Sequence, residues 1–381
     1  MTNLQDFLDA KPLFYDEIDL ERMPKVYESI KHSFSLPKII HIVGTNGKGT
    51  TGRFLANGLL QNKLSVGHYT SPHILNFNER IWRDGENVSD LVLEKSHQKL
   101  LALLSATQAE ALSYFEYTTL LAMLVYEGCD YVVLEAGLGG EYDATNVFDK
   151  TLSLFTPIDQ DHQAFLGNSI DEISSTKLRS MQECAILGFQ VHQKVITVFE
   201  KIAKERGCQT YTIEDFFSFD LQSLIRSESK SLPLYLQDNL LLALSALKFL
   251  GFESNVEALA SAPLFGRLTR IRPNVLLDVG HNLLAAKAIV NTLKDEKYIL
   301  IYNSYRDKDY EEMIKTLAPI VEHVELINVY DVRIEQKKML EAAITRAGLE
   351  VREFAIIEDN KQYLVFGSFS VAEAFLTYLE T

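Results

Sequence analysis

Short apolar runs of β-strand length recur along the chain and alternate with stretches of helical spacing. The helical stretches include 51–64, 115–127, 238–250 and 285–293. Buried strands that alternate with helices are typical of a mostly parallel sheet with helices on both faces, so the pattern predicts the α/β class. The apolar runs are KIIHIV (38–43), DYVVLE (130–135), TLSLFT (151–156), NVLLD (274–278), YILIYN (298–303), VELINV (324–329) and YLVFG (363–367).

The alternation falls into two series, which indicates two domains. The first series ends with the helical stretch near residue 250, and a shorter strand–helix series begins again at NVLLD. A length of 381 residues agrees with this division, since a domain commonly holds about 150 residues. We expect an N-terminal domain over 1–265 and a smaller α/β domain over 266–381.

Composition and charge narrow the class of protein. The formal net charge is −15, from 37 Lys plus Arg and 52 Asp plus Glu. This argues against a general nucleic-acid-binding protein, which needs basic surface, but not against a small anionic ligand in a cleft. The 3 cysteines lie far apart, so neither a disulfide framework nor a cysteine zinc site is expected. No signal peptide or membrane-spanning stretch is visible, and we expect a soluble, cytoplasmic protein.

The first polar cluster is GTNGKGT (44–50), which directly follows KIIHIV and precedes a helical stretch. Glycines allow backbone N–H groups to turn toward a phosphate, and the helix N-terminus adds partial positive charge. Lys48 can neutralise phosphate oxygens and the Thr50 hydroxyl can ligate Mg²⁺. The spacing departs from G-x-x-x-x-G-K-[ST], because Ile42 stands at the first glycine position. A glycine-rich turn with a solvated lysine is the less favoured alternative.

Two more polar clusters follow strands of the same domain. EAGLGGEYDATN (135–146) follows DYVVLE, and a carboxylate that ends a strand near a P-loop can organise Mg²⁺. TPIDQDH (156–162) follows TLSLFT and offers Asp161 and His162 to a metal or a phosphate. Taken alone, Glu135 fits a helix cap or a solvated side chain as well, and a lone His162 is more often structural.

The fourth cluster, DVGHN (278–282), follows NVLLD in the second domain. Asp278 can accept from ribose hydroxyls and His281 can donate to a phosphate, while an Asx turn at Asn282 is the alternative. Ligands of parallel α/β sheets bind beyond the carboxyl ends of the strands. The four clusters together predict ATP and Mg²⁺ between two domains, whose closure assembles the site.

A further polar segment is TSPHILNFNERI (70–81). Its proline and asparagines predict a loop, and its length fits a mobile lid or a compact surface loop. Composition alone does not decide whether its polar side chains touch a substrate.

In combination these motifs resemble the folylpolyglutamate synthase and dihydrofolate synthase family of the Mur ligase superfamily. The resemblance is colinear, covers nearly the whole chain and is weakest between residues 185 and 235. It implies a P-loop-type domain with ATP and a folate or pteroate site, followed by a Rossmann-like ligase domain. The motifs that carry it are GTNGKGT, TSPHILNFNERI, FEYTTLLAML with DYVVLEAGLGGEYDATN, FGRL, DVGHN and YRDKD.

The resemblance also implies roles for single residues. The nucleotide-binding residues that it implies are Gly44, Thr45, Asn46, Gly47, Lys48, Gly49, Thr50, Asn239, Arg267, Asp278 and His281. The implied ligands of two Mg²⁺ ions are Thr50, Ser71, Glu135 and His162, and a monovalent cation is a further expectation. The implied catalytic residues are Lys48, His162, Lys177 and His281. The implied pteroate-binding residues are Ser113, Phe115, Asp143 and Ala144, although Phe115 fits a core position of its helix about equally well.

Several positions depart from the family pattern. Glu141 stands where the family usually has arginine, so this loop lacks one positive charge against an acidic substrate. Lys177 falls where the family carries a lysine that can be carbamylated, but its neighbours read TKLR instead of EKAG, which puts the modification in doubt. Leu236 replaces an expected glutamine, and Leu283 replaces a proline with little expected effect.

The implied reaction joins L-glutamate to a pteroate or folate carboxylate through an acyl phosphate, with release of ADP and phosphate. The run SYFEY (113–117) favours a bifunctional enzyme that uses dihydropteroate and reduced folates. Folylpolyglutamate synthase activity alone, another Mur-type amide ligase and a non-catalytic nucleotide-binding module are the alternatives. We expect a monomer with small-molecule partners and neither nucleic acid nor membrane.

Overall fold

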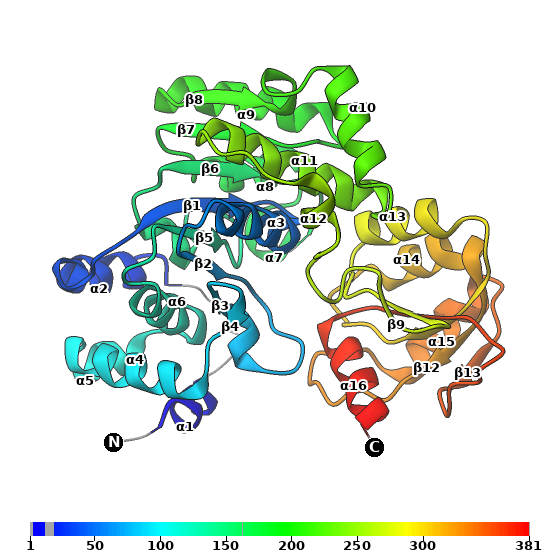
Figure 1. Ribbon diagram of the computed structural model, residues 1–381. Helices are drawn as coiled ribbons and strands as arrows, with labels where there is room; N and C mark the ends of the chain where they lie inside the picture. The colour runs from blue at the N-terminus through cyan, green and yellow to red at the C-terminus, as the bar shows by residue number, and fades with distance from the viewer. Residues whose placement is uncertain (1–2, 12–18, 162, 381) are drawn as a thin grey trace. The chain divides into compact units, whose positions relative to one another are not determined.

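The computed structural model describes residues 3–11, 19–161 and 163–380 (Figure 1). The chain divides into two compact units. Unit 1 holds Met1–Leu232 and Leu236–Ala262, and unit 2 holds Pro233–Tyr235 and Pro263–Thr381. This division lies beside the boundary expected at 265–266, while the ligand of each domain stays a prediction.

Unit 1 is built on an 8-stranded sheet in the order β4-β3-β2-β5-β1-β6-β7-β8. The strands β2, β5, β1, β6, β7 and β8 run parallel to one another. The strands β3 and β4 extend the sheet beyond β2 in antiparallel pairing. The predicted α/β class is confirmed. The strands are β1 Lys38–Val43, β2 Val66–Tyr69, β3 Ile81–Arg83, β4 Glu86–Asn87, β5 Tyr131–Glu135, β6 Leu152–Phe155, β7 Cys184–Leu187 and β8 Gln209–Thr212.

Successive side chains of β1 point to opposite faces of the sheet, and those from Ile39 to Val43 are all buried. Both faces of the sheet are therefore covered by helices. On one face, Ile39 of β1 shares a core with Leu100 of α4 and Leu120 of α6. On the other, α3 contacts β1, β2 and β5, and Gly58 of α3 packs against Leu247 of α11. The helices are α1 Leu4–Asp9, α2 Arg22–Ile30, α3 Lys48–Gln61, α4 Asp90–Leu103, α5 Ala106–Ala111, α6 Tyr114–Val125, α7 Gln163–Leu166, α8 Ile170–Leu178, α9 Gln193–Arg206, α10 Phe219–Glu228, α11 Leu234–Phe249 and α12 Val256–Ala260.

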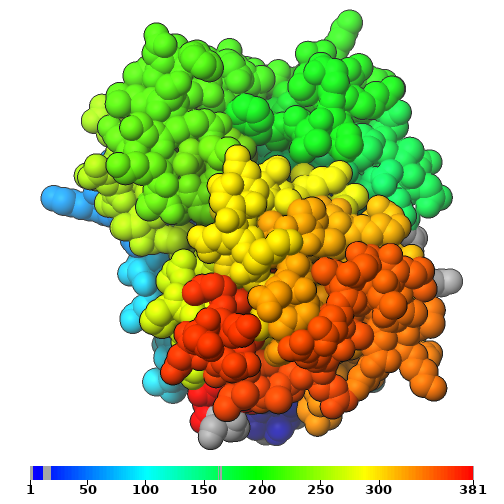
Figure 2. All heavy atoms as spheres, turned by 90° about the vertical axis from the view of Figure 1, so that its right-hand side faces the viewer, coloured from blue at the N-terminus to red at the C-terminus, as the bar shows by residue number. Residues whose placement is uncertain are grey.

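Unit 2 has a 6-stranded sheet in the order β13-β12-β11-β14-β10-β9, parallel except for β9. Its surface, coloured yellow to red, faces the viewer in Figure 2. Its strands are β9 Thr269–Arg272, β10 Val275–Leu277, β11 Tyr298–Tyr302, β12 Val321–Leu326, β13 Val351–Glu353 and β14 Tyr363–Phe366. Its helices are α13 Leu283–Leu293, α14 Tyr310–Leu317, α15 Lys337–Arg346 and α16 Phe369–Glu380. In the described residues no helix is long and apolar enough to cross a membrane.

The strands β1, β5, β6, β10, β11 and β14 lie where the apolar runs predict them, and the position of β12 needs one correction. The run VELINV predicts a strand over 324–329, but β12 spans Val321–Leu326. Its first residues include Glu322, which is exposed, and His323, so their polarity hid the start of the strand. The strands β2, β3, β4, β7, β8, β9 and β13 were not predicted, because stretches of two to four residues are too short to give a periodic signal.

Gly67 on β2 generates a test of the core. A Cβ at this position would lie 2.4 Å from Cδ1 of the buried Tyr126 ring. We expect Gly67→Ala to lower the free energy of unfolding by about 1–3 kcal/mol, because an overpacked core must shift. Urea denaturation followed by circular dichroism measures it. In a Tyr126→Leu background the same substitution should cost less, and equal costs in both backgrounds would contradict the predicted overlap.

Candidate functional site

The loop 44–47 joins β1 to α3 and has a backbone shape that only small residues allow. Gly47 has a φ of 86°, in the left-handed region. A Cβ at Gly47 would lie 2.4 Å from Oδ1 of Asn239, and a Cβ at Gly44 would lie 1.9 Å from Oγ1 of Thr156. The predicted phosphate loop therefore lies between a strand and a helix, as expected, and its backbone packs closely against Asn239 and Thr156.

Lys48 folds back over this loop. Its Nζ lies 3.3 Å from the carbonyl oxygens of Gly44 and Thr45. The same atom is 3.9 Å from Oε1 of Glu135, the last residue of β5. The structure thus brings together the lysine and the carboxylate that the sequence singles out in motifs associated with two different strands.

Glu135 lies in an arrangement suited to a hard cation. Oε2 of Glu135 accepts from the Thr70 hydroxyl and, at 3.3 Å, from the backbone N–H of Ser71. The Thr50 hydroxyl, in the first turn of α3, is buried and has no hydrogen-bond partner in the described part of the chain. A carboxylate and an orphan hydroxyl are oxygen donors of the kind that Mg²⁺ prefers, so these residues fit a divalent ion.

The other two predicted metal ligands are His162 and Ser71. His162 lies outside the described residues. Among the residues that are described, no group of three or more His, Cys, Asp or Glu side chains is arranged to hold a metal ion. Ser71, the remaining predicted ligand, contacts Glu135 only through its backbone N–H.

Lys177 on α8 is buried and contacts the backbone of the predicted phosphate loop. Its Nζ donates to the carbonyl oxygen of Gly44 at 2.9 Å. Burial, reinforced by the nearby charge of Lys48, lowers the pKa of Lys177 to about 7. A Cβ at Gly140 would lie 2.5 Å from the backbone oxygen of Lys177, so the glycine loop after β5 packs directly on α8.

The DATN segment is organised by Asp143. Oδ2 of Asp143 accepts from the Leu138 N–H at 2.7 Å, and Oδ1 accepts from the Thr145 N–H at 2.9 Å. Asp143 thereby caps the 3₁₀ turn η3, Ala144–Val147, and burial raises the pKa of the Asp143 carboxyl. Asp143 and Ala144 are both buried, so this segment is a rigid part of the site rather than a flexible loop.

Phe115 and Ser113 lie at the start of α6. The Ser113 hydroxyl accepts from the Glu116 N–H at 3.2 Å and caps the helix. The half-buried Phe115 ring packs 5.8 Å from the Tyr69 ring, between centroids. A Cβ at Gly137 would lie 2.6 Å from Cζ of Phe115, so the ring also lies on the glycine loop. Phe115 therefore joins the core with one part of its ring and stays accessible with another.

The segment 70–81, predicted as a loop, is a folded one. It contains the 3₁₀ turn η2, Phe77–Arg80, and its end forms the start of β3. Oε1 and Oε2 of Glu79 accept from the N–H groups of Asn76 at 2.8 Å and Ile74 at 2.7 Å. Arg80 donates from Nε to Nδ1 of His73 at 2.7 Å and is almost fully buried. These contacts within the segment are those of a compact loop, one of the two forms that its length allows.

The predicted cluster of unit 2 is assembled around Asp278 at the end of β10. Oδ2 of Asp278 accepts from the Tyr235 hydroxyl at 3.1 Å and the Leu268 N–H at 2.8 Å. Burial raises the pKa of Asp278, and the positive charge of Arg267 opposes this rise. His281 lies in the same turn, with Nδ1 3.1 Å from the Val279 carbonyl oxygen.

Sequence reasoning missed several partners in these sites. Thr70, beside the SPH motif, supports Glu135, and Tyr235, in YLQDN, holds Asp278. Hydroxyl groups leave no spacing signal, so neither could be singled out from sequence. At the position where arginine was expected, Glu141 has Oε2 3.4 Å from Nη1 of Arg179, so its negative charge is partly offset.

The lowered pKa of Lys177 predicts a pH-dependent stability. Between about pH 7 and pH 10.5 the unfolded chain binds the proton that folded Lys177 releases, so this residue makes the folded state more stable as the pH rises. Lys177→Met should therefore be stabilised relative to wild type near pH 7, with a difference that shrinks toward pH 10. Urea denaturation across this range measures it. The exposed Lys201→Met is the matched control, and a pH-independent difference for Lys177→Met would contradict the prediction.

Comparisons with known proteins agree with this geometry. The family described as the Mur ligase middle domain matches residues 42–232. A dihydrofolate synthase/folylpolyglutamate synthase of Haemophilus influenzae is 30% identical over 347 residues, which cover 80% of this chain and 78% of that protein.

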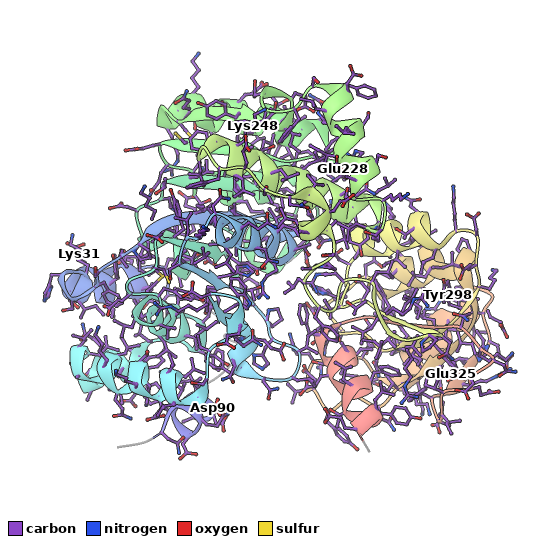
Figure 3. All side chains as sticks on the ribbon, viewed as in Figure 1. Lys31, Asp90, Glu228, Lys248, Tyr298 and Glu325 are labelled. Carbon is purple, nitrogen blue, oxygen red and sulfur yellow. The ribbon has the colours of Figure 1, made fainter. Side chains whose placement is uncertain are left out.

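Figure 3 shows the side chains of this chain. Solved structures match nearly its whole length. A folylpolyglutamate synthetase of Helicobacter pylori is 39% identical with a TM-score of 0.80, covering 99% of this chain and 98% of that one. A bifunctional folylpolyglutamate synthase/dihydrofolate synthase of Yersinia pestis, complexed with AMPPNP and a Mn ion, is 26% identical with a TM-score of 0.82 over 99% and 97%. On this identity and coverage, the chain belongs to the dihydrofolate synthase/folylpolyglutamate synthase family of Mur ligases.

Proposed function

We propose that this chain uses ATP to ligate L-glutamate to the carboxylate of dihydropteroate and of reduced folates. The observation that carries the proposal is that Lys48 contacts both the glycine loop and Glu135, while the helix that follows this loop buries an unpartnered Thr50 hydroxyl in its first turn. A loop of this kind binds the phosphates of a nucleotide, and the reaction begins by transfer of the terminal one.

In the first step the acceptor carboxylate attacks the γ-phosphorus of ATP. The bond from this phosphorus to the oxygen of the β-phosphate breaks, so an acyl phosphate forms and ADP leaves. Both reactants are anions, so their approach needs positive charge at the transferred group. The Lys48 ammonium and the backbone N–H groups of 44–49 supply it from the protein. A divalent ion held by Thr50 and Glu135, for which we propose Mg²⁺, neutralises further charge on the phosphates.

In the second step the amine of L-glutamate attacks the acyl carbon and phosphate leaves, which forms the amide. The acyl phosphate must be protected from water until the amine attacks. For unit 2 we propose that Asp278 accepts from the ribose hydroxyls, and that His281 and Arg267 meet the phosphates. A second Mg²⁺ near Ser71 and His162, and a carbamylated Lys177, stay predictions from the resemblance.

For the acceptor we propose a site formed by Phe115, Ser113, Asp143 and Ala144. The Phe115 ring lies on the glycine loop next to the rigid DATN turn, and its accessible part offers an apolar face to a pterin ring. The Ser113 hydroxyl already caps α6, so it contributes to binding mainly by setting the start of that helix.

Phosphate release from ATP tests the proposed reaction directly. Purified protein with Mg²⁺ and L-glutamate should release phosphate with dihydropteroate and with tetrahydrofolate, and should release little with neither. Turnover with tetrahydrofolate alone would reduce the activity to folylpolyglutamate synthase. Absence of turnover with both acceptors, despite tight ATP binding, would overturn the ligase and favour a nucleotide-binding module.

Phe115→Leu tests the acceptor site. Loss of ring contact should raise the KM for dihydropteroate about two- to tenfold, the usual range for one aromatic pair, with the KM for ATP unchanged. Phe148→Leu is the matched control, because Phe148 is fully buried in the same core. It should lower the free energy of unfolding by about 1 kcal/mol without altering either KM. An unchanged KM for dihydropteroate in Phe115→Leu would make Phe115 a core residue only.

A further inference from the structure

His41 lies in the middle of β1, fully buried in a strand that is otherwise apolar after its first residue. Its neighbours in register are Leu134 on β5 and Ser153 on β6. Its Nε2 lies 2.8 Å from Oγ1 of Thr145, in the DATN segment. Nδ1 has no hydrogen-bond partner among the described residues. A buried ring with one unsatisfied nitrogen costs stability, so an apolar side chain would serve the core better.

The direction of these hydrogen bonds follows from their donors. The Thr145 hydroxyl lies 2.5 Å from Oδ1 of Asp143, which also accepts from the Thr145 N–H. A carboxylate only accepts, so the single hydroxyl proton of Thr145 points to Asp143. Nε2 of His41 must then carry a proton and donate to Thr145. Burial, together with the charge of Lys150, holds the pKa of His41 well below its usual range, so the ring is neutral.

The result is a hydrogen-bond chain from His41 through Thr145 to Asp143. We propose that His41 is a positioning residue for the acceptor site, acting through Thr145 to hold Asp143 and Ala144 in place. This inference rests on the proposed function, because it takes the DATN turn to contact the pteroate group. It explains why a neutral, donating imidazole stands in β1 although it weakens the core.

Substitutions separate the donor from the bulk of the ring. His41→Leu removes the donor and should raise the KM for dihydropteroate about tenfold, the effect expected when one buried hydrogen bond is lost. His41→Gln can place an amide N–H near Nε2 and should stay within about threefold of wild type. Thr145→Val breaks the chain while leaving His41 in place, and should match His41→Leu. The KM for ATP should change less than twofold in all of them, roughly within the scatter of distant sites.

Controls keep a structural effect apart from a positioning effect. Ser153→Ala changes a buried polar side chain beside His41 in the sheet and should leave both KM values unchanged. Thermal unfolding of every variant accompanies the kinetics. If His41→Leu does not fold, Thr145→Val alone decides the question. A KM for dihydropteroate equal to wild type in Thr145→Val, or equal losses in His41→Gln and His41→Leu, would overturn the positioning role.

Failure of the underlying reaction has its own signature. If wild type turns over tetrahydrofolate but not dihydropteroate, the same comparison is made with tetrahydrofolate as acceptor. If wild type turns over neither, the proposed function is overturned and the positioning role falls with it, before any variant is measured.

Discussion

The close packing of the backbone 44–47 against side chains from other elements is the constraint on which the site depends. Thr156, after β6, and Asn239, on α11, approach the loop so closely that it admits no Cβ at Gly44 or Gly47. The N–H groups of Thr45 and Asn46 donate to the Pro157 carbonyl at 2.9 and 3.3 Å. Because two segments distant in sequence, residues 156–157 and Asn239, pack against the loop, its shape depends on the folding of the unit.

Two lysines meet at this loop, and their charges explain part of its chemistry. Lys48 and Lys177 both contact the carbonyl oxygen of Gly44, at 3.3 and 2.9 Å. Burial lowers the pKa of Lys177, and repulsion between its ammonium group and that of Lys48 lowers it further. Glu135 offsets only part of this charge. An anionic phosphate on the loop would relieve the rest, so the site is electrostatically prepared for a nucleotide.

The same elements join the nucleotide loop to the proposed acceptor site. The backbone of Lys177 supports Gly140, and the Glu141 N–H donates to the Thr176 carbonyl oxygen at 2.9 Å. On the sheet, β1 carries the phosphate loop at its end and His41 under the DATN turn. In the proposed reaction, one strand and one helix would therefore position both reacting groups, which favours a fixed distance between them.

The amino-acid sequence by itself determined the fold class, the central strands and the loops that follow them, because apolar runs and glycine-rich motifs are local signals. It also singled out Lys48 and Glu135, since their motifs stand at strand ends, while Asp143 was implied by the family resemblance. Only the tertiary structure decided which groups meet. The Lys177 contact to Gly44, the support of Glu135 by Thr70 and the chain from His41 to Asp143 join residues far apart in sequence. Such pairs depend on strand order and on burial, and neither is written in any single stretch of the chain.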